Sequence, residues 1–391
     1  MQGLTDPPRD AYTDVQILAL LHASDVTVDA GCELLNPDLS VVEDITGDFQ
    51  NVGGSVVWGQ DPDTAGETDP KLDVQGQRDC TFGLTRALNW GSDLVRLYKL
   101  HSGAGLVNVR FNVGVFCLTT PDLPVGVTPA VYQVTGFDLL YLLRRQVGDS
   151  YSVSAGSSYI DAVQQAISDA GLSNGAVIDT SGDATLPTDM VWPLIPTDAG
   201  PTTWLQIVNE LLAAIHYDPL WCDESGQFRS QPHVDPSTRT PEYFLDADDV
   251  VGTIVGVSRS LTQDVFGVAN TWVFVQQDFQ GTPVEGAGIY TVVNQSDGLS
   301  SIDQRGLVYA DQRTVAAANQ ATLVSLGDAQ VAKDRATATT LQVATRSLPI
   351  AGQGDVIAYS DVAAGGFFLV QATGWSLPLD GGDMTWALQS T

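Results

Sequence analysis

The chain has 391 residues, of which 43% are hydrophobic and 16% are charged, and this balance excludes a disordered tail. Its length favours two to four domains, at roughly 150 residues per domain. The formal net charge of −30 excludes stable nucleic-acid binding, because phosphate contacts need clustered Lys and Arg. Abundant Gly (38) and Pro (19) favour short strands joined by turns, so we predict a mainly β fold.

Targeting and membrane segments are not recognisable in the sequence. The first ten residues are polar and contain two prolines, unlike a secretory signal, so we expect synthesis in the cytoplasm. No apolar run approaches the roughly 20 residues that span a bilayer, so no integral membrane segment is expected. The cysteines lack C-x-x-C or zinc spacing, which predicts buried free thiols without a metal. They are Cys32, Cys80, Cys117 and Cys222.

Residues 1–150 are predicted to form an N-terminal antiparallel β domain, because short apolar runs alternate there with turn residues. Such runs are residues 56–58, 107–111 and 130–134. A short helix should follow the last run. Four residues recur there at helical spacing, and Asp138 lies in the first turn, where the helix dipole favours an acid. The four are Phe137, Leu140, Tyr141 and Arg144.

Residues 151–245 are predicted to form a small α/β domain with two amphipathic helices. In the first helix, apolar residues repeat every three or four positions across residues 160–170. Ser157 or Ser158 can cap its start, and Gly171 ends it.

The second helix of this region is predicted from an apolar stripe over residues 204–215, entered through Thr202 and Thr203. A β-hairpin should follow it, because residues 220–222 and 227–229 flank a turn at residues 223–226. Both helices need a partner surface, and the hairpin is the nearest candidate along the chain.

Residues 246–391 are predicted to form a C-terminal β-rich region with one helix. Its strands are expected at residues 253–257, 270–276, 288–293, 340–345, 355–359, 367–372 and 385–389. The Ala-rich stretch at residues 311–334 predicts the helix, despite Gly327. No tandem repeat of fixed period is evident along the chain.

The sequence contains no recognisable catalytic constellation. The four histidines lie outside metal-binding or nucleophile motifs, and the chain lacks G-x-S-x-G, Walker and G-x-G-x-x-G sequences. They are His22, His101, His216 and His233. We therefore predict no enzyme, no catalytic residues and no cofactor.

Two acidic clusters could hold a cation. The loop at residues 61–69 has four carboxylates, a density that can coordinate Ca²⁺. Leu72 occupies the closing position of an EF-hand, so only an irregular site is possible, and a solvated acidic loop is favoured. The second cluster, Asp246, Asp248 and Asp249, is interpreted as a polar connection between domains.

The eight tryptophans are dispersed over all three regions, which favours anchoring in the core or at interfaces. A sugar-binding aromatic surface is the alternative, and the sequence alone does not separate the two.

The order of segments resembles the hub proteins of tailed-virus tail tips, the baseplate hub of contractile phages and the N-terminal hub region of siphophage tail-tip proteins. The resemblance starts at residues 132–140, a strand that runs into a helix, and continues through the α/β unit to the hairpin at residues 220–228. Downstream, residues 270–275, 354–357 and 375–377 resemble the later hub strands.

The resemblance implies two β-barrel-like hub domains per chain and a homotrimer that forms a pseudo-sixfold ring on the hexameric tail tube. It also implies a virion location at the tail tip, without enzymatic activity. The expected partners are a distal tail protein ring, the tape measure protein, and tail fibre or receptor-binding proteins. Two alternatives remain open: a carbohydrate-binding adhesin, or a cell-wall hydrolase that uses acids of the loop at residues 61–69.

Overall fold

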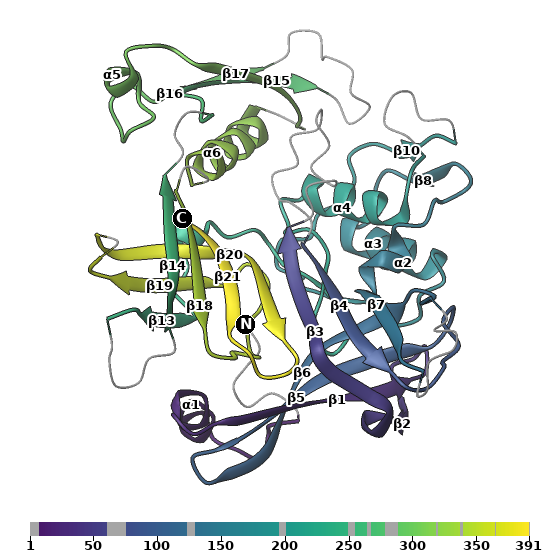
Figure 1. Cartoon of the computed structure of the whole chain (residues 1–391). Helices are drawn as coiled ribbons and strands as arrows, with labels where there is room; N and C mark the ends of the chain where they lie inside the picture. The colour runs from purple at the N-terminus through teal and green to yellow at the C-terminus, as the bar shows by residue number, and fades with distance from the viewer. Residues whose placement is uncertain are drawn as a thin grey trace.

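The computed structural model describes residues 8–60, 76–122, 130–194, 201–248, 255–263, 267–277, 288–317, 320–336, 339–363 and 365–390. The chain is mainly β, with an inserted α/β unit, as predicted (Figure 1). A 13-stranded sheet joins strands from the N-terminal and C-terminal parts of the chain.

The N-terminal strands form one end of this sheet, and every pairing among them is antiparallel. They are β1 (Thr27–Leu35), β2 (Val41–Asp44), β3 (Phe49–Gln60), β4 (Gly76–Leu84), β5 (Leu94–Gly103), β6 (Leu106–Leu118) and β7 (Tyr132–Asp138), with a short 3-10 helix η1 (Thr46–Asp48).

Helix α1 (Asp14–His22) precedes these strands and was not predicted from the sequence. Thr13 and Gln16 form a capping box at its start. Ile17 and Leu20 are fully buried beside Phe111 of β6 in a small cluster of their own. Because Val15 and Leu18 on the same helix are exposed, its apolar residues do not form the one-sided stripe that identifies an amphipathic helix.

The C-terminal strands continue the sheet. They are β13 (Tyr243–Asp246), β14 (Val255–Gln263), β18 (Thr339–Thr345), β19 (Val356–Asp361), β20 (Gly366–Pro378) and β21 (Met384–Ser390). The main hydrophobic core is shared with the N-terminal strands, since it contains Trp58, Phe82, Trp375 and Trp386.

The two sets of strands repeat one topology. In chain order, β1, β3, β4, β5, β6 and β7 correspond to β13, β14, β18, β19, β20 and β21. The neighbour order is β3-β4-β7-β6-β5-β1 in the first set and β14-β18-β21-β20-β19-β13 in the second. The sets differ at the last pair, because β1 is antiparallel to β5 whereas β13 is parallel to β19. We call these sets repeat 1 and repeat 2.

The α/β unit lies between the repeats in the chain. It contains β8 (Tyr151–Val153), α3 (Tyr159–Asp169), β9 (Ala176–Ile178), β10 (Met190–Trp192), α4 (Trp204–Ala214), β11 (Trp221–Cys222) and β12 (Phe228–Ser230), followed by η3 (Pro236–Thr238). Ser158 caps α3 and Thr203 caps α4, and β11 and β12 form the expected hairpin. Its core extends to Leu35, Leu94 and Val115, so the unit packs on the N-terminal strands.

Helix α2 (Leu140–Leu143), which leads into this unit, begins later than predicted. Phe137 and Asp138 belong to β7, and Asp138 Oδ1 accepts a hydrogen bond from the Leu140 backbone N–H at 3.1 Å. The predicted first-turn acid is therefore the last strand residue. Its side chain binds a backbone N–H that has no partner within so short a helix.

A second insertion separates β14 from β18. It contains β15 (Thr271–Gln277), β16 (Ile289–Val293), α5 (Ile302–Arg305), β17 (Ala310–Ala316) and α6 (Gln320–Ala336). In Figure 1, α6 lies between this small sheet and the C-terminal strands. In the small sheet, the aromatic rings of Trp272 and Phe274 of β15 are buried with Leu323 and Leu326 of α6.

The predicted helix at residues 311–334 is wrong in its first part. Residues 310–316 form β17, which pairs in parallel with β15. Val315 of this strand is buried against α6, and that tertiary contact overrides the helical preference of the Ala-rich sequence. Position 327 of α6 requires a glycine, because a Cβ there would lie 2.7 Å from the Tyr290 ring and 2.8 Å from the Phe274 ring.

Candidate assembly site

The two repeats meet where the end of β20 pairs with β3. Residues 374–378 are antiparallel to residues 55–59, and Trp375 lies opposite Trp58. The two indole rings are 6.4 Å apart and only 5% and 2% exposed. The pairing merges the repeats into one sheet, so the junction is a rigid contact.

Polar contacts fix both tryptophans and the end of β20. Trp58 Nε1 donates to Gln353 Oε1 at 3.3 Å, and Trp375 Nε1 donates to the Gly352 carbonyl at 3.4 Å. Lys99 of β5 is fully buried and donates to the Pro378 carbonyl at 2.5 Å. Burial lowers the pKa of Lys99 to about 8.

Three strands of the sheet, β14, β2 and β13, each have one neighbour among the described strands, and β14 and β2 end its longest run of paired strands. All four residues of β2 are exposed, and Val41 and Val42 are 50% and 53% exposed. In β14, Ser260, Leu261 and Thr262 are exposed. An open edge strand presents free backbone groups to another chain, so these two strands are candidate assembly edges.

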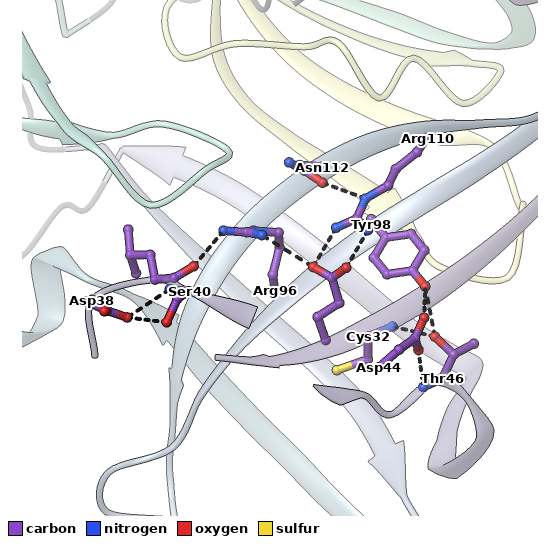
Figure 2. Close-up of polar contacts among 11 residues, drawn as sticks. Cys32, Asp38, Ser40, Asp44, Thr46, Arg96, Tyr98, Arg110 and Asn112 are labelled. Carbon is purple, nitrogen blue, oxygen red and sulfur yellow. Dashed lines mark hydrogen bonds and ion pairs between the residues drawn. The ribbon is translucent and has the colours of Figure 1, made fainter. Parts of the chain in front are cut away.

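A charged network lies behind the β2 edge (Figure 2). Glu33 of β1 is buried and accepts two hydrogen bonds from Arg110 of β6, at 2.5 and 2.7 Å. Arg96 of β5 adds a third contact at 3.3 Å and also donates to the Leu39 carbonyl in the turn before β2. The hydrogen bond from Arg110 lowers the pKa of Glu33, against the opposing effect of burial.

Tyr98 connects this network to the end of β2 and the turn that follows it. The Arg110 guanidinium lies 3.9 Å from the centre of the Tyr98 ring. The Tyr98 hydroxyl contacts Asp44 at 3.2 Å and Thr46 at 3.0 Å (Figure 2). The ring crosses β1 at Gly31, where a Cβ would lie 2.3 Å from it.

The network of Glu33, Arg96 and Arg110 has a structural role. Both oxygens of Glu33 bind guanidinium groups, so the carboxylate is held in its charged form. A general base needs a carboxylate that can take a proton from a substrate, and Glu33 lacks that freedom. Its effect is to hold β2 and the preceding turn in place.

The structure places the four histidines in three settings. His22 lies in the last turn of α1. His101 lies 3.4 Å from the Ser347 hydroxyl, and both residues are buried, so this Ser–His pair has no solvent access. Burial lowers the pKa of His101 to about 3. His216 and His233 lie 5.3 Å apart, and His233 Nδ1 lies 2.8 Å from Asp218 Oδ1. No sequence pattern indicated that the last two would meet.

The acidic clusters are only partly described. The loop at residues 61–69 and Asp249 lie outside the described residues. Asp246 and Asp248 each accept a backbone N–H, from Asp248 and Val362 respectively. No group of three or more His, Cys, Asp or Glu side chains with metal-binding arrangement occurs within the described ranges.

The tryptophans anchor the interior. Five of the eight are buried, and the other three are half-buried, so no exposed tryptophan platform exists. Three of the four cysteines are buried and Cys117 is half-buried, and all four are free thiols, as predicted. Among the helices of the described ranges, none has the length and apolarity to cross a membrane.

The junction and the network could not be identified from sequence. The residues that form them are far apart in the chain, as Glu33 and Arg110 show with 77 positions between them. One signal was available for the repeat: β6 and β20 are both 13 residues long and each follows a hairpin partner directly. Insertions of different length separate the other strands and conceal the period.

Comparison with known proteins shows the fold. No known family and no curated protein matches the sequence. A tail protein from Neisseria meningitidis superposes with a TM-score of 0.61 at 13% identity, over 93% of this chain and 97% of that one. The 43 kDa tail protein of prophage MuSo2 from Shewanella oneidensis gives 0.58 at 9% identity, over 92% and 98%.

A prophage tail protein from Listeria monocytogenes gives a TM-score of 0.53 at 11% identity, over 93% of this chain and 94% of that one. These likenesses extend over nearly the whole length of each chain, although few residues are identical. The resemblance in the sequence is thereby confirmed at the level of fold: this chain has the fold of phage tail proteins.

Proposed function

We propose that this chain is a structural hub at the tail tip of a tailed virus, where three copies form a ring that closes the tail tube. The observation that carries the proposal is the topological repeat. Each chain supplies two similar units joined edge to edge, so three chains supply six. A ring of six similar units with threefold symmetry matches a sixfold tube on one side and threefold components on the other.

The architecture supports a structural rather than a catalytic role. The repeats share one core and one sheet, and a buried ion network fixes the turn at one sheet edge. In this proposal, adhesion and cell-wall cleavage belong to other tail proteins. The partners are a distal tail protein ring, the tape measure protein, and fibres or receptor-binding proteins.

The proposal includes the division of the chain near residues 150 and 245. Repeat 1, the α/β unit and repeat 2 then form three domains, with the α/β unit packed against repeat 1 through Leu35, Leu94 and Val115. Residue 245 itself lies in β13, so brief proteolysis of the native protein should cut near residue 150 and in the connection that precedes β13 before it cuts within the sheet, because exposed connections unfold locally at lower cost.

Electron microscopy of the purified protein tests the proposed ring. We expect class averages with three chains and six similar lobes around a central opening. Particles with a single chain or with twofold symmetry at high protein concentration would contradict the proposal. A glycan-binding adhesin would instead need an exposed aromatic surface, and no tryptophan is exposed.

A further inference from the structure

We propose that residues 260–262 on the outer edge of β14 pair with residues 119–121 of a second copy, and that this strand pairing closes the ring. The inference rests on the proposed trimer and deepens it by naming the contact. It follows from the repeat, because the same edge in repeat 1 is already occupied within the chain.

The first step is the equivalence of β14 and β3. Each pairs antiparallel with the next strand of its repeat, β14 with β18 and β3 with β4. The last pair in repeat 1 is Gln60 with Gly76, and the last pair in repeat 2 is Gln263 with Thr339. Counting back from these ends, residues 260–262 of β14 correspond to residues 57–59 of β3.

The second step is the occupant of the β3 edge. Strand β19 begins at Val356, opposite Gln371 of β20. Beyond that point β20 runs free of β19, and from Gly374 onward it pairs with β3 instead. The end of β20 that extends beyond β19 therefore pairs with the outer edge of β3.

The third step is the corresponding overhang in repeat 1. Strand β5 begins at Leu94, opposite Cys117 of β6. The chain runs past this point, and Thr119 donates its backbone N–H to the Thr135 carbonyl on the β7 side. Gly374 lies three positions beyond Gln371, but one of these positions is the extra residue of a bulge between Ala372 and Gly374, and β6 has no such bulge opposite β7. Thr119 is therefore the equivalent of Gly374, where β20 meets β3. Thr120 beside it is exposed, and Pro121 is half-buried.

Charge is compatible with a contact between two copies. Each copy has a formal net charge of −30, so copies repel one another over most of their surface. Residues 260–262 of β14 are Ser, Leu and Thr, and none is charged. Backbone hydrogen bonds can form there without placing acids of two copies opposite each other.

The register that follows from the repeat is specific. Residues 374 and 59 are opposite each other, and the two strands run antiparallel. The equivalent pairs between copies are Thr119 with Thr262, Thr120 with Leu261 and Pro121 with Ser260. Opposed residues in an antiparallel pair have Cα atoms about 4.5–5.5 Å apart, within reach of a disulfide.

Disulfide trapping tests this register in the full chain. The double variant Pro121→Cys with Ser260→Cys should form disulfides between copies, giving species of two and three chains on a non-reducing gel. The matched control, Pro121→Cys with Thr262→Cys, places the thiols two positions out of register and should link far less. The native cysteines are poor competitors, because three are buried and Cys117 is half-buried.

Proline substitution tests the same edge by a different property. The Gly54 carbonyl of β3 accepts from the Leu379 N–H of β20, so every second residue, including Trp58, turns its backbone groups toward β20. The equivalent of Trp58 is Leu261, so Leu261→Pro removes only an outward donor and should keep its melting temperature while the three-chain mass is lost. Ser260→Pro should lose stability, because its N–H points toward β18.

The outcomes separate this inference from the proposed function. If the unmodified protein has three chains but both cysteine pairs fail to link, or link equally, then the β14 assignment is wrong and the ring proposal stands. If the unmodified protein is a single chain at high concentration and no pair links, the ring proposal fails as well.

Discussion

Repeat 1 and repeat 2 share a strand order but differ at the outer edge of one equivalent strand, β3 in repeat 1 and β14 in repeat 2. In repeat 1, β3 is covered by the end of β20, whereas in repeat 2 the corresponding edge of β14 is open among the described residues. The difference shows how one topology serves two purposes: the covered edge joins the repeats within a chain, and the open edge is available to join chains.

The repeats also differ in the ion pairs that hold them. Repeat 1 contains the network of Glu33, Arg96 and Arg110. In repeat 2, Arg259 of β14 binds the buried Asp361 of β19 at 2.6 Å, and Asp361 also accepts from Tyr359 at 3.0 Å. Both arrangements tie together strands that are not neighbours in sequence.

The largest expected effect is at the covered edge. Trp58→Ala removes a buried indole from the contact between the repeats and should lower the free energy of unfolding by about 3–5 kcal/mol. Denaturant unfolding followed by circular dichroism measures it. Val362→Ala, at a side chain 78% exposed, is the control and should change stability by less than about 0.5 kcal/mol. Equal effects of the two would mean that the junction contributes little.

Glu33→Gln tests the network of repeat 1. The change leaves Arg96 and Arg110, whose side chains are only 14% and 25% exposed, without their carboxylate and should cost about 3 kcal/mol. Glu43→Gln is the matched control, because Glu43 pairs with Arg86 at the surface and should cost under about 1 kcal/mol.

The pH dependence of Glu33 gives a second readout. Its pKa is lowered in the folded protein, so the stability it contributes is present above its unfolded pKa of about 4.3 and is lost as the pH falls through the folded value. The stability difference between the unmodified protein and Glu33→Gln should therefore shrink at acid pH. A difference that stays constant from pH 7 to pH 3 would contradict the ion-pair account.

Lys99→Met tests the end of β20 and should have the smallest effect of the three. The pKa of Lys99 is lowered to about 8, so between pH 8 and its unfolded value near 10.4 the unfolded chain binds more protons. Stability from this group thus rises with pH across that window. The unmodified protein should gain roughly 2–3 kcal/mol relative to Lys99→Met between pH 8 and pH 10.5. An unchanged difference would show that Lys99 is not desolvated at the junction.

Local parts of the fold were predictable because local sequence determines them. The caps at Ser158 and Thr203 and the hairpin turn at residues 223–226 use short-range hydrogen bonds that a single segment specifies. The C-terminal strands were found for the same reason, from apolar runs bounded by turn residues. Helix α1 had a usable signal in Thr13 and Gln16, because these two residues have the spacing of a capping box.

Tertiary contacts decided what sequence reasoning missed. Residues 310–316 form a strand because β15 offers them a ladder and α6 covers Val315. The junction pairs Trp58 with Trp375, and the network pairs Glu33 with Arg110, and neither pair has a local pattern. The repeat is a property of strand order, so residue periodicity could not reveal it.

The mass of the purified full chain in solution tests the central claim most directly. Sedimentation or native mass measurement should give three times the 41.5 kDa of one chain across a range of concentrations. A strict monomer or dimer at high concentration would contradict the account of a ring built from three pairs of repeats.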